Sequence, residues 1–272
     1  MSVFASLKQV THWSVLILLV SIALAGSTAR AQSVPPAVPQ ESAPRIENRS
    51  SSTFVPPPLP NDHGMPHGRQ HGGASRGCQS YASLTALVPE LNEYVWGTSA
   101  SARPSFWFYV PKIEEKGLPL EFVLQDRTDR YVYRTEFLLN PGPADVLGVT
   151  VPEVAIPLDS NRAYHWTLSL QCDPDRPTSI VYVRGSVQHV MMAPDLKARL
   201  ASASPLERAA IFANSGYWFD ALTELGQLRQ SDPSNLAYVE GWERLLRQVD
   251  ITYPEASSIS PRWASMPTSV TH

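Results

Sequence analysis

Three evenly spaced histidines are the residues of this chain that could most readily do chemistry. His63, His67 and His71 lie in the stretch NDHGMPHGRQHGGASRGC (61–78). Imidazole and thiolate groups bind Zn(II), Cu(II) and Ni(II), so the stretch is a candidate metal site. A spacing of four places ligands on one face only in a helix, which the surrounding glycines and prolines oppose. We therefore favour a solvated tether, keep the histidines as weak metal candidates, and predict no cofactor.

The two cysteines of the chain are candidates for a disulfide bond. Cys78 and Cys172 are the whole cysteine content. An even pair in an exported protein is interpreted first as a disulfide, with two unpaired thiols as the alternative. We predict the Cys78–Cys172 disulfide.

An aromatic run offers a candidate binding surface. In SFWFYV (105–110) the alternation of a strand gives Phe106 and Phe108 to one face and Trp107 and Tyr109 to the other. Trp107 and Tyr109, if exposed, could stack on sugar rings. We favour the alternative, a central strand buried on both faces by a second sheet and by helices, because large aromatic side chains mostly fill cores.

The acidic side chains do not assemble into a known catalytic or calcium motif. The pairs Asp126/Asp129 and Asp173/Asp175 lie in the turn-like stretches QDRTDR and CDPDRP. Such pairs can bind calcium, but aspartate at these positions more often closes a turn with its own backbone. The sequence contains no G-x-S-x-G, P-loop, H-E-x-x-H or dinucleotide-binding glycine motif. We therefore predict no catalytic residue.

Between residues 84 and 190 the hydrophobic pattern alternates, as in strands. In AYHWTLSLQC (163–172) every second residue is apolar, which predicts a half-buried strand. The other strand-like runs are 84–88, 105–110, 120–126, 130–137, 146–151 and 179–190. Short strands separated by turn clusters, with no helical stretch between them, predict an antiparallel, immunoglobulin-like β-sandwich over residues 78–192.

After Met192 the period becomes helical. We predict helices over 195–203, from Ser204 to about 213, over 218–229, and from Asp232 to Gln248. Ser204-Pro205-Leu206-Glu207 has the form of a capping box with proline at the first helical position. The pair over 204–231 has the spacings of one tetratricopeptide unit. The predicted fold class is therefore α+β, with a small three- to four-helix, tetratricopeptide-like unit at 193–250 after the sandwich.

The flanking segments have other compositions. Residues 1–31 combine a basic start, the apolar run WSVLILLVSIALA and an Ala-Arg-Ala ending, which predicts a secretory signal peptide cleaved after Ala31. We expect a disordered linker over 32–77, a disordered tail over 251–272, and no membrane span in the mature chain. Lysine and arginine do not cluster, and the formal net charge is −3, so nucleic acid is not predicted as a partner.

Several motifs occur in an order that resembles one known family. They are LTALVPE (84–90), SFWFYVP (105–111), PLEFVLQD (119–126), VYRTEF (132–137), YHWTLSLQCDP (164–174) and SPLERAAIFANSGYWFDALTELGQLRQSDPSN (204–235). Over residues 76–250 the chain resembles the mainly cyanobacterial family called domain of unknown function 928. The resemblance implies no activity, substrate or catalytic residue. Its members carry a Gly- and Arg-rich lead-in where this chain has residues 63–77, which further favours the tether.

Two functions are compatible with these patterns. The first is a non-enzymatic, periplasmic or extracellular module that binds a protein or a surface polymer. The second is a hydrolase of cell wall or exopolysaccharide that uses paired carboxylates as acid and nucleophile. The absence of catalytic motifs from the sequence favours the binding module.

Overall fold

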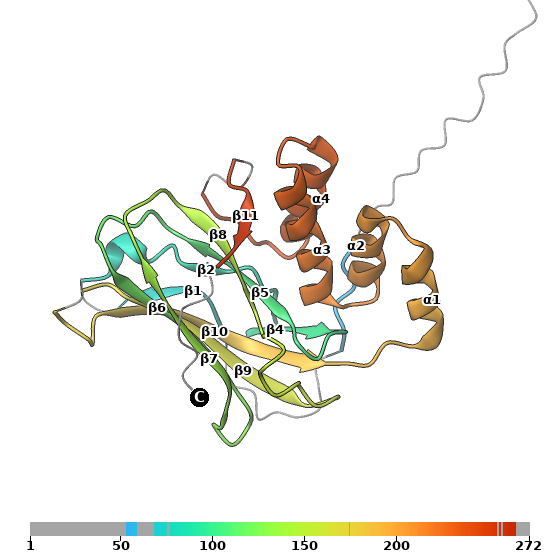
Figure 1. Cartoon of the computed structure of the whole chain (residues 1–272), viewed down its shortest axis with the longest axis horizontal. Coiled ribbons are helices and arrows are strands. Elements are labelled where there is room, and N and C mark those ends of the chain that lie inside the picture. The colour runs from blue at the N-terminus through green and yellow to red at the C-terminus, as the bar shows by residue number, and fades with distance from the viewer. Residues whose placement is uncertain are drawn as a thin grey trace, which may run out of the picture. The chain divides into compact units, whose positions relative to one another are not determined.

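Eleven strands and four α-helices make up the part of the chain that the structure describes (Figure 1). The computed structural model describes residues 53–58, 68–74, 77–173, 175–254, 256 and 258–264. The strands are β1 (Arg69–Ala74), β2 (Thr85–Ala86), β3 (Glu90–Leu91), β4 (Tyr94–Ser99), β5 (Ser105–Val110), β6 (Leu118–Gln125), β7 (Tyr131–Leu139), β8 (Asp145–Thr150), β9 (Ala163–Gln171), β10 (Ile180–His189) and β11 (Pro261–Trp263). The helices are α1 (Pro194–Ser202), α2 (Pro205–Asn214), α3 (Trp218–Ser231) and α4 (Leu236–Arg247).

The strands form one large, curled, mixed sheet. Its order is β11-β8-β5-β2-β1-β10-β9-β6-β7, with β4 paired to β10 and β3 paired to β4. Most neighbours are antiparallel, but β4 runs parallel to β10 and β11 runs parallel to β8. The α+β class is thus confirmed, whereas the purely antiparallel sheet is wrong because two strands missed in the sequence add in parallel. The immunoglobulin-like sandwich is not confirmed.

The hydrophobic periods predict most of the observed elements. Strand β5 occupies the predicted residues, and β9 alternates between buried and partly exposed side chains, as its apolar period requires. The capping box at α2 is present: the Ser204 side chain accepts from the Glu207 N–H, and the Glu207 carboxylate accepts from the Ser204 N–H. The four predicted helices are confirmed, but a tetratricopeptide-like character of the pair α2–α3 is not.

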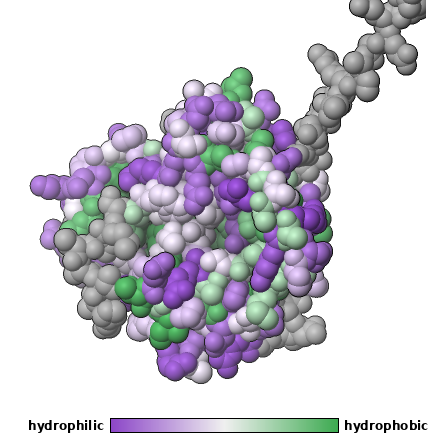
Figure 2. Space-filling model, turned by 45° about the vertical axis from the view of Figure 1, so that its right-hand side comes forward, coloured by the Kyte–Doolittle hydropathy of each residue, from purple (hydrophilic) through white to green (hydrophobic). Residues whose placement is uncertain are grey.

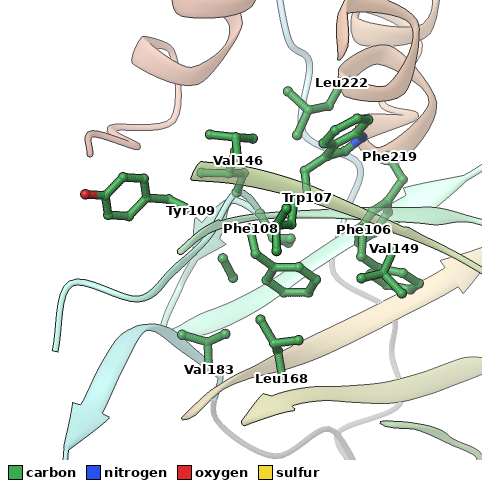
Figure 3. Packing of buried hydrophobic residues seen from close by; sticks show 14 of the residues in the cluster. Phe106, Trp107, Phe108, Tyr109, Val146, Val149, Leu168, Val183, Phe219 and Leu222 are labelled. Atoms are coloured by element: carbon green, nitrogen blue, oxygen red, sulfur yellow. The ribbon is translucent and has the colours of Figure 1, made fainter. Parts of the chain in front are cut away.

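Strand β5 is buried on both faces and joins the sheet to the helices. Phe106 and Phe108 point toward the β9–β10 side of the curl, near Leu168 and Val183 (Figure 3). Their rings contact those of Phe122 and Trp166, with ring centroids 5.0–6.1 Å apart. A strand covered on both sides needs apolar residues at consecutive positions rather than at every second one.

The other face of β5 meets the helices. Trp107 donates a hydrogen bond from Nε1 to Thr223 Oγ1 at 3.2 Å. Gly226 of α3 leaves room for the Trp107 ring, since a Cβ at Gly226 would lie 2.7 Å from a ring carbon. The Trp107 ring also packs edge-to-face against Trp242 and at a tilt against Trp263, at centroid distances of 5.8 and 4.5 Å. The sheet and the four helices therefore share one core.

Polar contacts fix α3 on β4 and the loop that follows β4. The Thr98 hydroxyl donates to the Gly216 carbonyl oxygen at 2.8 Å, and the Trp218 indole donates to the Leu87 carbonyl oxygen at 2.9 Å. The Asp220 carboxylate accepts from the Ala100 N–H at 2.8 Å. Part of Asp220 remains exposed, but burial of its carboxyl group raises the pKa of Asp220 to about 6, against the hydrogen bonds that lower it.

Part of the predicted linker over 32–77 is folded. Arg69–Ala74 forms β1, which pairs with β10 on one side and β2 on the other. Gly72 permits this close approach, because a Cβ there would lie 2.6 Å from a Val181 methyl carbon. Farther upstream, Phe54 is buried against the Trp218 ring at 4.9 Å, and the Val55 N–H donates to the Ala213 carbonyl oxygen. Within the predicted linker, residues 69–74 therefore take part in backbone pairing, and Phe54 provides an aromatic contact to α3.

Several described residues of the predicted tail over 251–272 pack against the core. Ile251, Tyr253 and Ile259 are buried, and Tyr253 stacks on Tyr109 with ring centroids 5.1 Å apart. Pro261–Trp263 then adds to the sheet as β11. The predicted signal peptide over 1–31 lies outside the described residues, as do residues 265–272 of the tail.

The predicted disulfide is confirmed. Cys78 and Cys172 are bonded, with Cα atoms 5.6 Å apart, which is an ordinary separation for the bond. The bond ties the segment after β1 to the end of β9, across a sequence separation of 94 residues.

Removal of this disulfide should lower stability substantially. In the chain-entropy model, cross-linking a loop of this length contributes about 4 kcal/mol to the free energy of unfolding. We expect Cys78→Ser/Cys172→Ser to lose most of that amount in guanidinium unfolding followed by circular dichroism. Reductant should lower the wild-type midpoint toward that of the variant and leave the variant unchanged. Equal midpoints in oxidising buffer would contradict a stabilising bond.

The raised pKa of Asp220 predicts a pH-dependent contribution to stability. Between the ordinary aspartate pKa of 3.8 and the folded value of about 6, the folded state binds a proton that the unfolded state releases. The contribution is thus fully present below pH 4 and is lost as pH rises through 6. We expect the stability of the wild type relative to Asp220→Asn to fall over this range by at most about 3 kcal/mol. Urea unfolding at pH 4, 5, 6 and 7 measures it, and a difference constant with pH would contradict the assignment.

Candidate functional site

A hollow among the described residues forms a groove at the seam of the curled sheet. It has a volume of about 820 Å³, within the range of ordinary ligand sites. One wall is β7, from Arg134 to Leu139, and the other comprises the first residues of β8 together with Arg262 and Ala264 at β11. The groove therefore lies where the two ends of the strand order, β7 and β11, approach each other.

Two turns at the open end of the β6–β7 hairpin, where Leu118 pairs with Leu139, lie beside this groove. Gly117, with a φ of +74°, lies in the turn that enters β6, and the Asn140–Pro143 stretch leaves β7. Gly142 exchanges two backbone hydrogen bonds with Ile113, at 2.9 and 3.0 Å. This bridge closes one end of the groove and directs the chain into β8.

Charged side chains line both walls. Arg134 of β7 forms an ion pair with Glu121 of β6 at 2.5 Å, and that hydrogen bond raises the pKa of Arg134. Arg262 of β11 forms a close ion pair with Asp145 of β8. Among the described residues, Glu136 has neither an ion pair nor a side-chain hydrogen bond. Because Glu136 lies directly opposite Glu121 in the β6–β7 register, two like charges face each other. Arg134 forms an ion pair with Glu121, and the charge of Glu136 also contributes to raising the pKa of Arg134.

The groove also presents apolar groups and one buried hydroxyl. Leu138 is 65% exposed, and Ile113, Phe137, Leu139 and Leu147 line the interior. Thr135 is only 4% exposed, and its hydroxyl makes no hydrogen bond of ordinary geometry among the described residues. Burial raises the pKa of the nearby Tyr133, and the Thr135 hydroxyl opposes this rise. This combination of an apolar floor and a few polar groups is typical of binding sites.

The histidine candidates do not form a metal site in the described chain. His71 lies in β1, where its Nδ1 is 3.2 Å from Thr85 Oγ1. His63 and His67 lie outside the described residues. Among the residues that are described, no group of three or more His, Cys, Asp and Glu side chains could hold a metal ion.

Trp107 and Tyr109 do not form an exposed binding surface. They are 1% and 3% exposed, because α3, α4 and the segment after α4 cover that face of β5. The structure therefore agrees with the buried alternative and contradicts a sugar-stacking role for these two rings.

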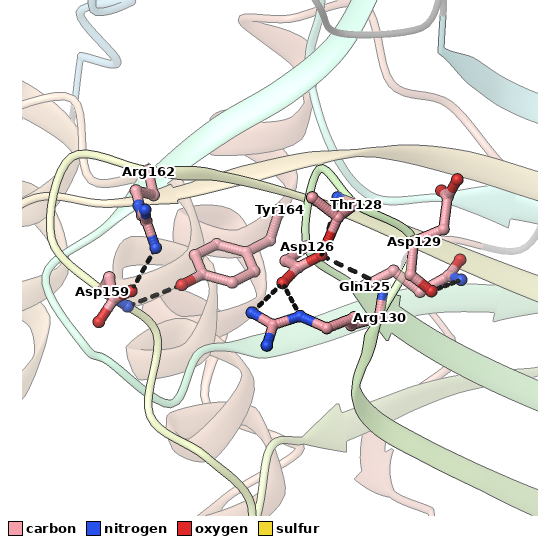
Figure 4. A network of polar contacts seen from close by, with 8 residues as sticks. All are labelled: Gln125, Asp126, Thr128, Asp129, Arg130, Asp159, Arg162 and Tyr164. Carbon is pink, nitrogen blue, oxygen red and sulfur yellow. Dashed lines mark hydrogen bonds and ion pairs between the residues drawn. The ribbon is translucent and has the colours of Figure 1, made fainter.

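The acidic pairs considered for calcium close turns. Asp126 accepts from the backbone and hydroxyl of Thr128 and pairs with Arg130 at 2.6 Å (Figure 4), and these hydrogen bonds lower the pKa of Asp126. Asp173 likewise accepts from the Asp175 N–H at 2.9 Å. Each carboxylate thus accepts hydrogen bonds from backbone N–H groups of its own loop, as aspartate usually does in turns.

His165, a histidine of the sheet, has a structural partner. It is partly buried on β9, where its Nδ1 lies 3.0 Å from Ser186 Oγ. Burial lowers the pKa of His165, which favours the neutral ring. His165 does not line the groove and therefore lies outside the candidate site.

The molecular surface on the helix side has a mixed character. In the view of Figure 2, hydrophilic and hydrophobic residues are interspersed rather than gathered into one broad apolar patch. None of the helices in the described residues combines the length and apolar character that crossing a bilayer requires. These features leave the seam groove as the strongest candidate site.

The sequence indicates the residues of only one wall of the groove. In RYVYRTEF the alternation sets Arg134 and Glu136 on the outer face, and the next outer position is the apolar Leu138. Alternating charged and apolar positions indicate which side chains of this strand face outward, but they do not show that the strand borders a groove.

A curled mixed sheet with one helical layer defines an α+β protein, and its seam groove is the candidate site. Residues 71–259 match the family model described as Domain of Unknown Function (DUF928), which covers more than half of the chain. The chain belongs to this family. Comparison with curated proteins gives no match.

Proposed function

We propose that this protein is an exported, non-enzymatic binding module that holds a protein or surface-polymer ligand in the seam groove. The observation that carries the proposal is the groove itself, which combines an exposed Leu138, an apolar floor and a carboxylate without an ion-pair partner in the described chain. Such a site can supply hydrophobic burial and electrostatic specificity together.

Two features support export. The predicted leader over residues 1–31 ends in a small-residue cleavage motif. The Cys78–Cys172 disulfide persists most readily in an oxidising compartment. Together they favour a mature chain that begins at Gln32 and folds in the periplasm or outside the cell.

A polysaccharide hydrolase is the second candidate, because Glu121 and Glu136 are cross-strand neighbours in the groove. A glycosidase needs one carboxyl group as acid and a second as nucleophile or base. Here Arg134 already engages Glu121, and Arg262 engages Asp145. The groove therefore offers one carboxylate without such a partner among the described residues, which favours binding over catalysis.

The export proposal predicts a defined mature N-terminus. Expression of the full chain in a bacterium with an export pathway should yield a periplasmic or secreted protein that starts at Gln32. N-terminal sequencing and intact-mass measurement check this outcome. Ala29→Arg/Ala31→Arg should block processing, because signal peptidase requires small residues at these positions. Accumulation of unprocessed wild type in the cytoplasm would contradict export.

The binding proposal predicts that a charge at the groove rim weakens ligand capture. We expect Leu138→Arg to reduce the material recovered from envelope or culture-medium fractions about ten-fold, the equivalent of about 1.4 kcal/mol. Ile156→Arg is the matched control, because Ile156 is 69% exposed but does not line the groove.

Thermal unfolding should show that both variants fold. Equal recovery by the two variants would place the ligand elsewhere. Release of reducing sugar from cell-wall glycan by the wild type, but not by Glu136→Gln, would favour the hydrolase instead.

A further inference from the structure

Strand β7 has one edge that no other strand of the described chain pairs with. Its only partner in the sheet is β6. Six consecutive residues of β7, Arg134 to Leu139, line the groove. The exposed backbone N–H and C=O groups of an edge strand can pair with an added extended chain. Six residues of strand span about 20 Å, which is enough for a peptide of similar length.

On the opposite wall of the groove, a short segment from a distant part of the chain already pairs with the sheet as a strand. Pro261–Trp263 pairs in parallel with Val146–Gly148 of β8, far from it in sequence. Arg262 binds Asp145 of the receiving strand, and the Trp263 ring packs on Trp107 at 4.5 Å. Backbone pairing, one ion pair and one apolar anchor therefore hold β11 in place.

The β7 edge offers the matching groups for a second such segment. On the outer face, Glu136 provides a negative charge and Leu138 an exposed apolar contact. On the inner face, Phe137, Leu139 and Ile113 provide an apolar wall. A basic side chain beside Glu136 would also relieve the repulsion between Glu136 and Glu121, which face each other across β6 and β7.

We propose that the groove binds an extended peptide segment of a partner protein, which adds to β7 as a strand with a basic residue opposite Glu136. The inference rests on the proposed binding function and specifies its ligand class. Alternate residues of the peptide would point to the two faces of the sheet. The preferred segment therefore alternates basic and apolar side chains, so that one set meets Glu136 and the other the inner wall.

Peptide binding measured by fluorescence anisotropy tests this proposal on the disulfide-bonded mature chain. The probe is a fluorescein-labelled hexapeptide that alternates valine and lysine. One control peptide alternates valine and glutamate. Two further controls are valine–lysine peptides whose backbone nitrogens are methylated at every second residue, at the odd residues in one peptide and at the even residues in the other. In one of these two peptides the methyl groups replace the N–H donors that would face β7. We expect the probe to bind at least about ten times more tightly than the valine–glutamate peptide. We expect the same difference between the probe and one of the two methylated peptides.

Protein variants locate the bound peptide. Glu136→Lys should weaken binding of the probe about ten-fold or more, and Glu136→Gln should weaken it less. Glu90→Lys is the matched control, because Glu90 is an exposed strand glutamate outside the groove, and it should leave binding unchanged. Equal binding by both methylated frames and the parent, or by Glu136→Lys and wild type, would overturn strand addition at this edge.

Experiments can distinguish a failure of strand addition from a failure of groove binding. If no peptide binds while Leu138→Arg still loses its envelope ligand, strand addition is wrong and groove binding stands. If Leu138→Arg also keeps its ligand, the proposed function fails as well. A wild-type dimer in sedimentation equilibrium that Leu138→Arg dissociates would assign the edge to a second copy of the chain and overturn the peptide proposal.

Discussion

Burial of strand β5 on both faces is the constraint on which the rest of the structure depends. Phe106 and Phe108 fill the concave side of the sheet, while Trp107 and Tyr109 require a cover on the other side. Truncation of one such aromatic side chain typically costs about 3–5 kcal/mol, so four in succession make the helical layer part of the core. The helices are therefore an integral layer of the domain and not a separate unit attached to it.

The seam groove follows from the same arrangement. Helix α3 and strand β11 cover the β5–β8 region, whereas β6 and β7 extend beyond it on the other side of the curl (Figure 1). The two ends of the strand order do not pair with each other, and charged residues on both walls oppose indiscriminate pairing. Arg134 and Arg262 each neutralise a carboxylate within their own wall, so the remaining charge of Glu136 gives the groove its electrostatic preference.

The sequence predicted the elements whose side chains alternate regularly and missed those held by backbone pairing. Strands β5 and β9, the capping box of α2 and the disulfide could be predicted because each has a local signature. Strand β1 is rich in glycine, and β11 is three residues long in a serine- and proline-rich segment, so neither has a hydrophobic period. The groove could not be predicted either, because its walls come together only when the sheet curls.

The late position of β11 in the chain has a consequence for biogenesis. Asp145 and Arg262 are separated by 117 residues, so β8 keeps a bare edge until the ribosome has made nearly all of this sequence. Strand β1 likewise cannot pair with β10 until β10 has been synthesised. Topologies that depend on such distant pairings fold slowly, and their uncovered strands are prone to aggregate. Until the last residues of the sheet have been made, the open edge of β8 is therefore available for pairing with other chains.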